Sequence, residues 1–199
     1  MAFVRYVDED QAPPLVRSVF EAVRKQRGRV PNSQRVLAHN PEVLRAFGPF
    51  VGAVSRETVL PLRLKELAIL KVTLINGCKY CLAHHYHAAR AAGVTMDEML
   101  ALNEFEQSAL FSEKDRAALA YAEEITANNR HMCRQVKERL KTLLSDAEIV
   151  DLTVACCMFN FLNRFNHCLD VDLDADVPAP LVQLLEATPG PAEHATGLS

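Results

Sequence analysis

Apolar residues recur at helical spacing along most of this 199-residue chain. A first helix is predicted over residues 15–27, where Leu15, Val16, Val19, Phe20 and Val23 lie three or four positions apart before Gly28. A short helix is expected within residues 30–41. Pro41 can open another helix over residues 41–57, with Pro49 as a kink or a boundary. No segment shows the alternation typical of a β-strand, so the pattern predicts an all-α, multihelical bundle.

The most apolar helix is predicted to begin after Pro61. Its leucines and isoleucine surround Glu66 on nearly every side, and such a helix is normally buried at the centre of a fold. Asn76-Gly77 is a helix stop. The next helix is therefore expected to begin near Cys78 and to run to Gly93.

Capping signals predict the remaining helices. Thr95 with Glu98, and Ser145 with Glu148, fit the capping box, in which a hydroxyl and a carboxylate each accept from an exposed backbone N–H. Ser112 with Asp115 is a weaker version of the same signal. Helices are therefore expected from about residues 95, 112 and 145, with another over residues 131–144.

The carboxyl-terminal segment differs in composition from the rest. We predict one all-helical domain over residues 1–175 and a tail over 176–199, which is rich in Pro, Ala and Gly. Its apolar residues can dock on the body or on a neighbouring subunit: Leu181, Leu184 and Leu185. The last ten residues or so should be poorly ordered.

Composition narrows the class of protein. With 49% hydrophobic residues and a net charge of -3, the chain reads as globular and lacks a basic block or arm that would bind nucleic acid. The acidic start does not fit a signal peptide, and no apolar run is long enough for a membrane span, so a cytoplasmic protein is expected. In that reducing compartment, the six cysteines are not expected to form a structural framework.

The strongest chemical signal combines two thiols and an imidazole. Cys78 and Cys81 are spaced i, i+3, and His85 follows Cys81 at i+4, so the three lie on one stripe of a helix. At a helix start, Cys78 should have a lower pKa than a free thiol. Carboxyl groups in apolar surroundings hold their proton more tightly, which suits Glu66 to proton transfer.

Each of these residues also has a structural interpretation. The cysteines could be half of a zinc site or an inert pair, but no second pair of metal ligands is visible, so redox chemistry is favoured. Glu66 could instead pair with Arg63 or Arg90. His84 and His87 fall off the stripe and read as surface or interface groups. Four further cysteines lack this context and are expected to pack as small hydrophobic residues: Cys133, Cys156, Cys157 and Cys168.

A second set of residues repeats the spacing of the first. Glu148, Asn160, Asn163 and His167 lie 82 positions after Glu66, Cys78, Cys81 and His85. This repeat suggests an internal duplication of a helix pair, against chance alignment of two amphipathic helices. Asn160, Asn163, Arg164 and His167 also form a polar stripe, expected to be a buried hydrogen-bond network or a subunit contact rather than a substrate site.

The pattern E-x11-C-x2-C-x3-H resembles the signature of the AhpD-like alkylhydroperoxidases, within the carboxymuconolactone decarboxylase superfamily. The resemblance runs from about Pro41 to Gly93 and continues through DRAALAYAEEIT and FNFLNRFNHCLDVDLD, which are typical of its peroxidase-related branch. It implies an all-helical fold assembled as homotrimers or homohexamers, with no cofactor. AhpD itself has a histidine before the second cysteine, where this chain has Tyr80.

The resemblance also implies catalytic roles. Cys81 would attack a hydroperoxide, Cys78 would donate a proton and then form a disulfide with Cys81, and Glu66 and His85 would relay protons. The implied function is a thiol peroxidase or a disulfide reductase that an unknown dithiol reduces. Two alternatives remain: a cofactor-free decarboxylase, which would not need the cysteines, and an oligomeric helical protein whose thiols only sense redox state.

Overall fold

The computed structural model describes residues 1–127 and 132–191, and it is all-α over these segments. This confirms the predicted fold class. The helices are α1 Pro14–Arg27, α2 Asn32–Leu37, α3 Pro41–Val54, α4 Leu62–Ile75, α5 Lys79–Ala91, α6 Met96–Leu100, the 3₁₀ turn η1 Leu102–Glu104, α7 Glu113–Ala127, α8 Arg134–Leu143, α9 Asp146–Cys168 and α10 Ala179–Ala187.

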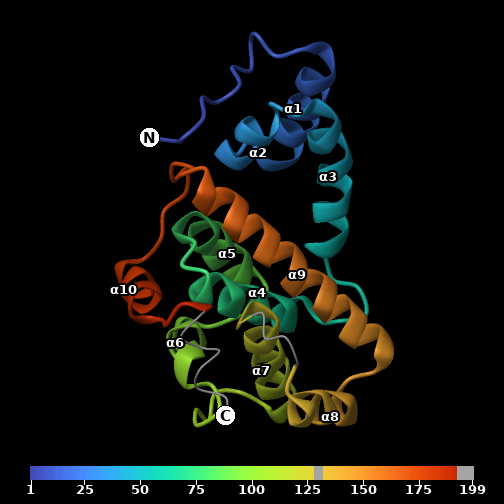
Figure 1. Ribbon diagram of the computed structural model, residues 1–199, viewed down its shortest axis with the longest axis vertical. Coiled ribbons are helices and arrows are strands. Elements are labelled where there is room, and N and C mark those ends of the chain that lie inside the picture. The colour runs from blue at the N-terminus through green and yellow to red at the C-terminus, as the bar shows by residue number, and fades with distance from the viewer. Residues whose placement is uncertain (128–131, 192–199) are drawn as a thin grey trace.

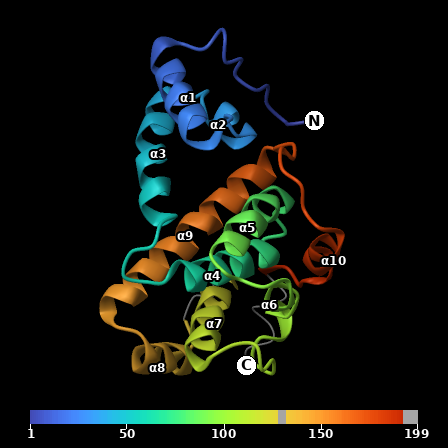
Figure 2. The same ribbon diagram turned by 180° about the vertical axis from the view of Figure 1, so that it is seen from behind.

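Helix α4 is the centre of the bundle, as its sequence predicts. Its residues from Leu64 to Ile75 are all buried, and it packs against α5, α7 and α9 (Figure 1). The view from behind shows α5 beside α4, with α9 crossing both (Figure 2). A helix apolar on every side needs neighbours on every side, and α4 supplies the core to which the others attach.

Helices α1, α2 and α3 stand together at one end of the molecule (Figure 1). They enclose a small apolar core of their own, with Val16, Phe20 and Leu44 buried. Helix α3 continues through Pro49 to Val54 and leads into the loop before α4, so the proline does not end the helix. This group therefore forms a cover over one end of α5 and α9.

The predicted capping signals are confirmed. In the boxes at the start of α6 and α9, the hydroxyls of Thr95 and Ser145 accept from the backbone N–H groups of Glu98 and Glu148, whose carboxylates accept in return. Asp115 makes the same pair of bonds with Ser112 at the start of α7. These local bonds fix three helix starts.

The predicted duplication of a helix pair is wrong. Residues 62–88 form two helices separated by a turn at Gly77, which has a φ of +66°, whereas the corresponding part of the second set lies within the single helix α9. The residues of α9 that align with Asn76 and Gly77 are Met158 and Phe159, and neither ends a helix. The shared spacing is a coincidence of helical period.

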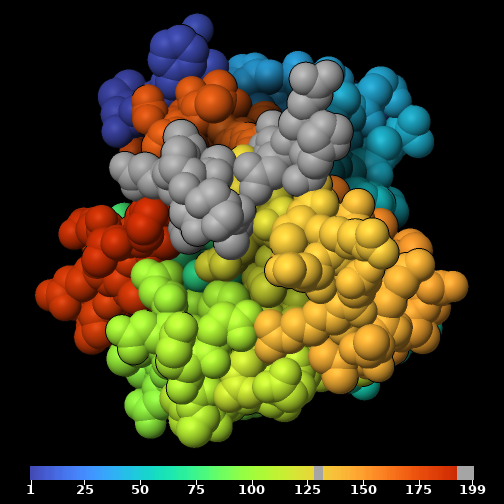
Figure 3. Space-filling view, turned by 60° about the horizontal axis from the view of Figure 1, so that its bottom comes forward, coloured from blue at the N-terminus to red at the C-terminus, as the bar shows by residue number. Residues whose placement is uncertain are grey.

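Helix α10 lies within the segment predicted as a tail. Leu181 and Leu185 are buried against the core of α4 and α5, so the expected docking is on the body of the protein. Figure 3 shows this segment, in red, next to the light-green residues around α6. The domain boundary at residue 175 stays a prediction, and residues 192–199 lie outside the described segments.

None of the helices in residues 1–127 and 132–191 combines the length and the apolarity that crossing a bilayer requires.

Candidate active site

The turn between α4 and α5 places both cysteines of the CxxC motif. Gly77 adopts the left-handed conformation that lets the chain reverse after α4. Cys78 is then the N-cap of α5, and its Sγ accepts a hydrogen bond from the backbone N–H of Cys81 at 3.3 Å. The two thiols therefore share the first turn of the helix.

The two sulfur atoms form a hydrogen-bonded dithiol. They lie 2.8 Å apart, and the Cys78 thiol donates to Cys81. That bond, together with burial, raises the pKa of Cys78. Burial alone would raise the pKa of Cys81, but hydrogen bonds from Cys78, Asn166 and Asn163 and the charge of His85 lower it to about 7.

The prediction that Cys78 is the acidic thiol is therefore wrong, because the helix start does not decide the matter. The hydrogen bond runs from Cys78 to Cys81, which raises the pKa of Cys78 and lowers that of Cys81, so Cys81 loses its proton first. Both side chains are buried, and Cys81 is 4% exposed.

Glu66 and His85 form a second pair beside the dithiol. His85 Nδ1 lies 2.8 Å from Glu66 Oε2, and the carboxylate is almost fully buried. The imidazole also meets the edge of the Phe159 ring. Burial lowers the pKa of His85, but the charges of Glu66 and Cys81 outweigh burial, so the pKa of His85 is raised.

The alternative pairing of Glu66 with an arginine is wrong. Arg63 forms ion pairs with Glu98 and Asp115 at the start of α6 and α7. Arg90 donates to a backbone carbonyl in the loop after α5. The chemistry-bearing residues predicted from the sequence thus lie together: the dithiol, the imidazole and the buried carboxylate.

Helix α9 contributes asparagines to the same region. Asn76 at the end of α4 donates to the side-chain oxygens of Asn160 and Asn163, and Asn163 donates to Thr73. This part of the predicted polar stripe is a buried network, as expected. Arg164 and His167 point outward and are exposed.

Asn166 is a site residue that the sequence analysis missed. Its Nδ2 lies 3.3 Å from Cys81 Sγ, and the side chain is 4% exposed. The available signal was the i, i+3, i+6 spacing of Asn160, Asn163 and Asn166, which places three amides on one face of α9. The buried face of α9 therefore ends with Asn166, whereas the predicted stripe ended with the next residue, His167.

A cavity of about 330 Å³ opens next to Cys81. Cys81, His85 and Glu66 line it, whereas Cys78 does not. Most of its wall is apolar and comes from α2, α3 and α9, through Leu37, Leu44, Phe47, Val51, Phe159, Phe161, Leu162 and Phe165. A small apolar molecule in this cavity would meet Cys81 before Cys78.

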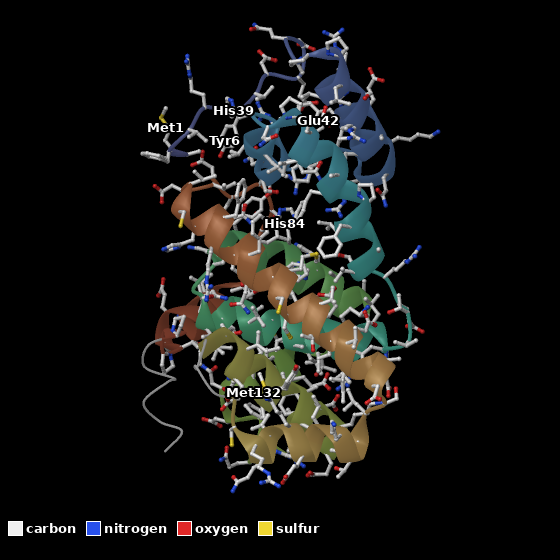
Figure 4. The ribbon with its side chains drawn as sticks, turned by 45° about the vertical axis from the view of Figure 1, so that its right-hand side comes forward. Met1, Tyr6, His39, Glu42, His84 and Met132 are labelled. Carbon is white, nitrogen blue, oxygen red and sulfur yellow. The ribbon has the colours of Figure 1, made fainter. Side chains whose placement is uncertain are left out.

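A cluster around Asp174 holds the cover of the cavity in place. Asp174 lies 2.7 Å from His84 Nε2, accepts from the Tyr80 hydroxyl at 3.1 Å and accepts from the backbone N–H of Asn32 at 2.7 Å. Figure 4 shows His84 between the N-terminal helices and α5. His84 also lines the cavity. His84 is half-buried and paired with Asp174, so it is not a solvated surface group, and its interpretation as an interface group stays a prediction.

The zinc alternative has no ligand set in this region. Within residues 1–127 and 132–191, no three His, Cys, Asp or Glu side chains are grouped so that they could hold a metal ion. Outside the CxxC motif, burial raises the pKa of Cys156, and Cys157 and Cys168 are exposed on the outer side of α9.

These features define a class: an all-helical protein with a buried dithiol, a histidine–carboxylate pair and an apolar cavity at the reactive sulfur. Residues 41–124, which include all four of these polar residues, match the carboxymuconolactone decarboxylase family. The match covers less than half of the chain, so it shows that the segment holding the site resembles the carboxymuconolactone decarboxylase family.

Two similar proteins match a larger share of the chain than the family model does. The chain is 28% identical over 141 residues to the uncharacterized protein Rv2313c of Mycobacterium tuberculosis. The matched segment covers 70% of this chain and 48% of Rv2313c, which is about half the length of that protein. The crystal structure of the debrominase Bmp8 is 25% identical, with a TM-score of 0.70 over 91% of this chain and 95% of Bmp8.

A second solved structure supports the fold alone. A peroxidase-related protein from Ralstonia eutropha, described as an alkylhydroperoxidase AhpD core, has a TM-score of 0.74 over 94% of this chain and 97% of its own. Its identity is 19%.

Proposed function

We propose that this protein is a thiol-dependent peroxidase that reduces an apolar organic hydroperoxide. The observation that carries the proposal is the position of Cys81. It lines an apolar cavity, its pKa is lowered to about 7, and a second thiol lies 2.8 Å away. A thiolate that a substrate can reach, with a resolving thiol beside it, favours reversible oxidation.

The reaction balances with the groups present. The Cys81 thiolate attacks the hydroxyl oxygen of the hydroperoxide, so that an S–O bond forms and the O–O bond breaks. The alkoxide leaves with the electron pair and takes a proton to become the alcohol, and Cys81 becomes a sulfenic acid. The Cys78 sulfur then attacks the sulfur of the sulfenic acid, and a disulfide forms as water leaves.

His85 is the proton donor for the leaving alkoxide in this mechanism. Its raised pKa favours the imidazolium, and it lines the same cavity as Cys81. Glu66 holds Nδ1 at 2.8 Å and so orients the ring and stabilises its positive charge. Helix α5 thereby supplies both the nucleophile and the acid, and α4 supplies the carboxylate that orients the acid.

Turnover needs an external dithiol, which exchanges with the Cys78–Cys81 disulfide and restores both thiols. We also propose that the protein assembles as a homotrimer or homohexamer, as the family resemblance implies. Light scattering on the purified protein gives the number of subunits.

The test is intact-mass measurement of the reduced protein before and after one equivalent of cumene hydroperoxide. The expected result is a loss of two hydrogen atoms per chain, with peptide mapping that places the new bond between Cys78 and Cys81. Cys81→Ser should abolish peroxide consumption, and Cys78→Ser should stop at the sulfenic acid. If both variants keep full activity, the thiol mechanism is wrong and acid–base chemistry of the decarboxylase kind is favoured.

A second function, reductive dehalogenation, is favoured by the similarity to Bmp8. A complex of a cysteine-to-alanine variant of that debrominase with 2,3,4-tribromopyrrole is known. The same dithiol would replace an aromatic bromine by hydrogen. The C–Br bond breaks and a C–H bond forms with one thiol proton, the other proton is released with bromide, and the two thiols supply two electrons as their disulfide forms. Bromide release from 2,3,4-tribromopyrrole by the reduced protein tests this function, and its absence removes it.

A further inference from the structure

The amide of Asn166 is satisfied on one side and unpaired on the other. Its Nδ2 donates to Cys81 Sγ at 3.3 Å. Its Oδ1 is buried and has no hydrogen-bond partner among residues 1–127 and 132–191. Because buried amide oxygens are nearly always paired in folded proteins, an unpaired one beside a reactive sulfur indicates a partner that arrives during the reaction.

The chemistry of the sulfur fixes the orientation of the amide. A thiolate has no hydrogen to donate, so only the N–H side of an amide can face it. The oxygen of Asn166 must then point away from the sulfur. One amide group can therefore serve both partners. Its Nδ2 donates to the sulfur, and its Oδ1 can accept a hydrogen bond from a hydroxyl group that is bound to that sulfur or is about to bind to it.

The other polar groups near Cys81 are already engaged, so Asn166 is left as the acceptor for such a hydroxyl. The Nδ1 atom of His85 is held by Glu66, and in the proposed reaction the imidazole serves the leaving oxygen. Asn163 also contributes a hydrogen bond to Cys81, but its side-chain oxygen already accepts from Asn76, so it cannot serve as the free acceptor. Asn166 is the asparagine of α9 that lines the cavity.

We propose that Asn166 is a catalytic residue with two tasks: Nδ2 holds the Cys81 thiolate, and Oδ1 accepts the O–H of the hydroperoxide during attack and the O–H of the sulfenic acid afterwards. The inference rests on the proposed function. In the step itself, the hydroxyl hydrogen stays on its oxygen and is held by Oδ1 while the S–O bond forms. The amide thus aligns the attacked oxygen with the sulfur, and the leaving oxygen faces His85.

The same geometry restricts the ligand. A molecule that binds at Cys81 should carry a hydrogen-bond donor at the reacting end and an apolar body. Neutral alcohols, which are the products of hydroperoxide reduction, meet this description. Methyl ethers of the same shape do not, because they leave the Oδ1 acceptor unpaired.

Two substitutions separate the two tasks. Asn166→Asp keeps an acceptor and loses the N–H donor, and Asn166→Leu loses both. The pKa of Cys81, read from the pH dependence of its alkylation by iodoacetamide, should rise in both variants, and more in Asn166→Asp because a carboxylate then faces the thiolate. An unchanged pKa in both variants would overturn the donor task.

Binding of two probes tests the acceptor task without turnover. Calorimetry with the reduced protein should show 2-phenyl-2-propanol binding about tenfold more tightly than its methyl ether. The preference should persist in Asn166→Asp and vanish in Asn166→Leu, with Asn166→Ala as a smaller replacement if the leucine variant does not fold. A preference that survives in the Leu and Ala variants would refute this task.

Gln34→Leu is the matched control. Gln34 also lines the cavity, and its buried amide oxygen has no hydrogen-bond partner, either sulfur included, among residues 1–127 and 132–191. Its substitution should leave the alkylation profile of Cys81 unchanged. Neither measurement uses a peroxide. Absence of the probe preference in the wild-type protein would therefore refute the role of Asn166, whereas a lack of peroxide turnover would refute the proposed function.

Discussion

Removal of the Cys78 thiol should make Cys81 a weaker acid. In Cys78→Ala the 2.8 Å hydrogen bond between the two sulfur atoms is lost. Burial raises the pKa of Cys81, and this hydrogen bond is the largest effect that lowers it. A hydrogen bond to a charged group contributes about 1.5–3 kcal/mol, which corresponds to a pKa higher by about 1 to 2. From a pKa of about 7, the thiolate fraction at pH 7 would fall from about one half to between about 10% and 1%.

The assay is the rate of alkylation of Cys81 by iodoacetamide between pH 5 and 10, followed by mass measurement of the peptide that contains it. The rate should rise with a midpoint near pH 7 in the wild-type protein and at a clearly higher pH in Cys78→Ala. Cys78→Ser is the control, because its hydroxyl still donates to the thiolate and its midpoint should lie between the other two. A midpoint near pH 7 in Cys78→Ala would refute the reasoning.

Three further variants test other parts of the structure. Glu66→Gln should bring the pKa of His85 below its ordinary value, since burial then dominates. Histidine NMR titration measures this pKa, and an unchanged pKa in the variant would mean that Glu66 contributes nothing to it. Asp174, whose pKa is lowered to about 2, stabilises the fold above about pH 4 and loses this effect as the pH falls toward 2. In Asp174→Asn the free energy of urea unfolding should therefore fall less steeply between about pH 4 and about pH 2. At neutral pH it should be lower by about 1 kcal/mol, a value discounted because the group is partly exposed. An unaltered fall at acid pH would contradict this. Asp151→Ala removes the carboxylate that pairs with the fully buried Lys65 and should cost about 3 kcal/mol in denaturant unfolding, whereas an effect below about 1 kcal/mol would mean that the backbone carbonyls suffice.

Local signals in the sequence were enough for most of the helices, and α10, in the segment predicted as a tail, is the exception among the described residues. The apolar surroundings of α4, the Asn76-Gly77 stop and the capping boxes all act within a few residues, so the chain itself encodes them. The spacing of the CxxC motif and His85 is local in the same sense, because one helix carries all three. The duplication failed because spacing alone does not record whether a helix continues or breaks.

Tertiary packing decided the chemistry of the site. The cavity opens to Cys81 and not to Cys78 because helices α2, α3 and α9 close around one side of α5. Asn166 reaches Cys81 across 85 positions of sequence, and Asp174 reaches His84 across 90. Hydrogen bonds between such distant residues depend on how whole helices pack, and helical period carries no information about them. The sequence thus determined most of the helices and the set of reactive groups, and only the tertiary structure decided which sulfur is acidic and can be reached.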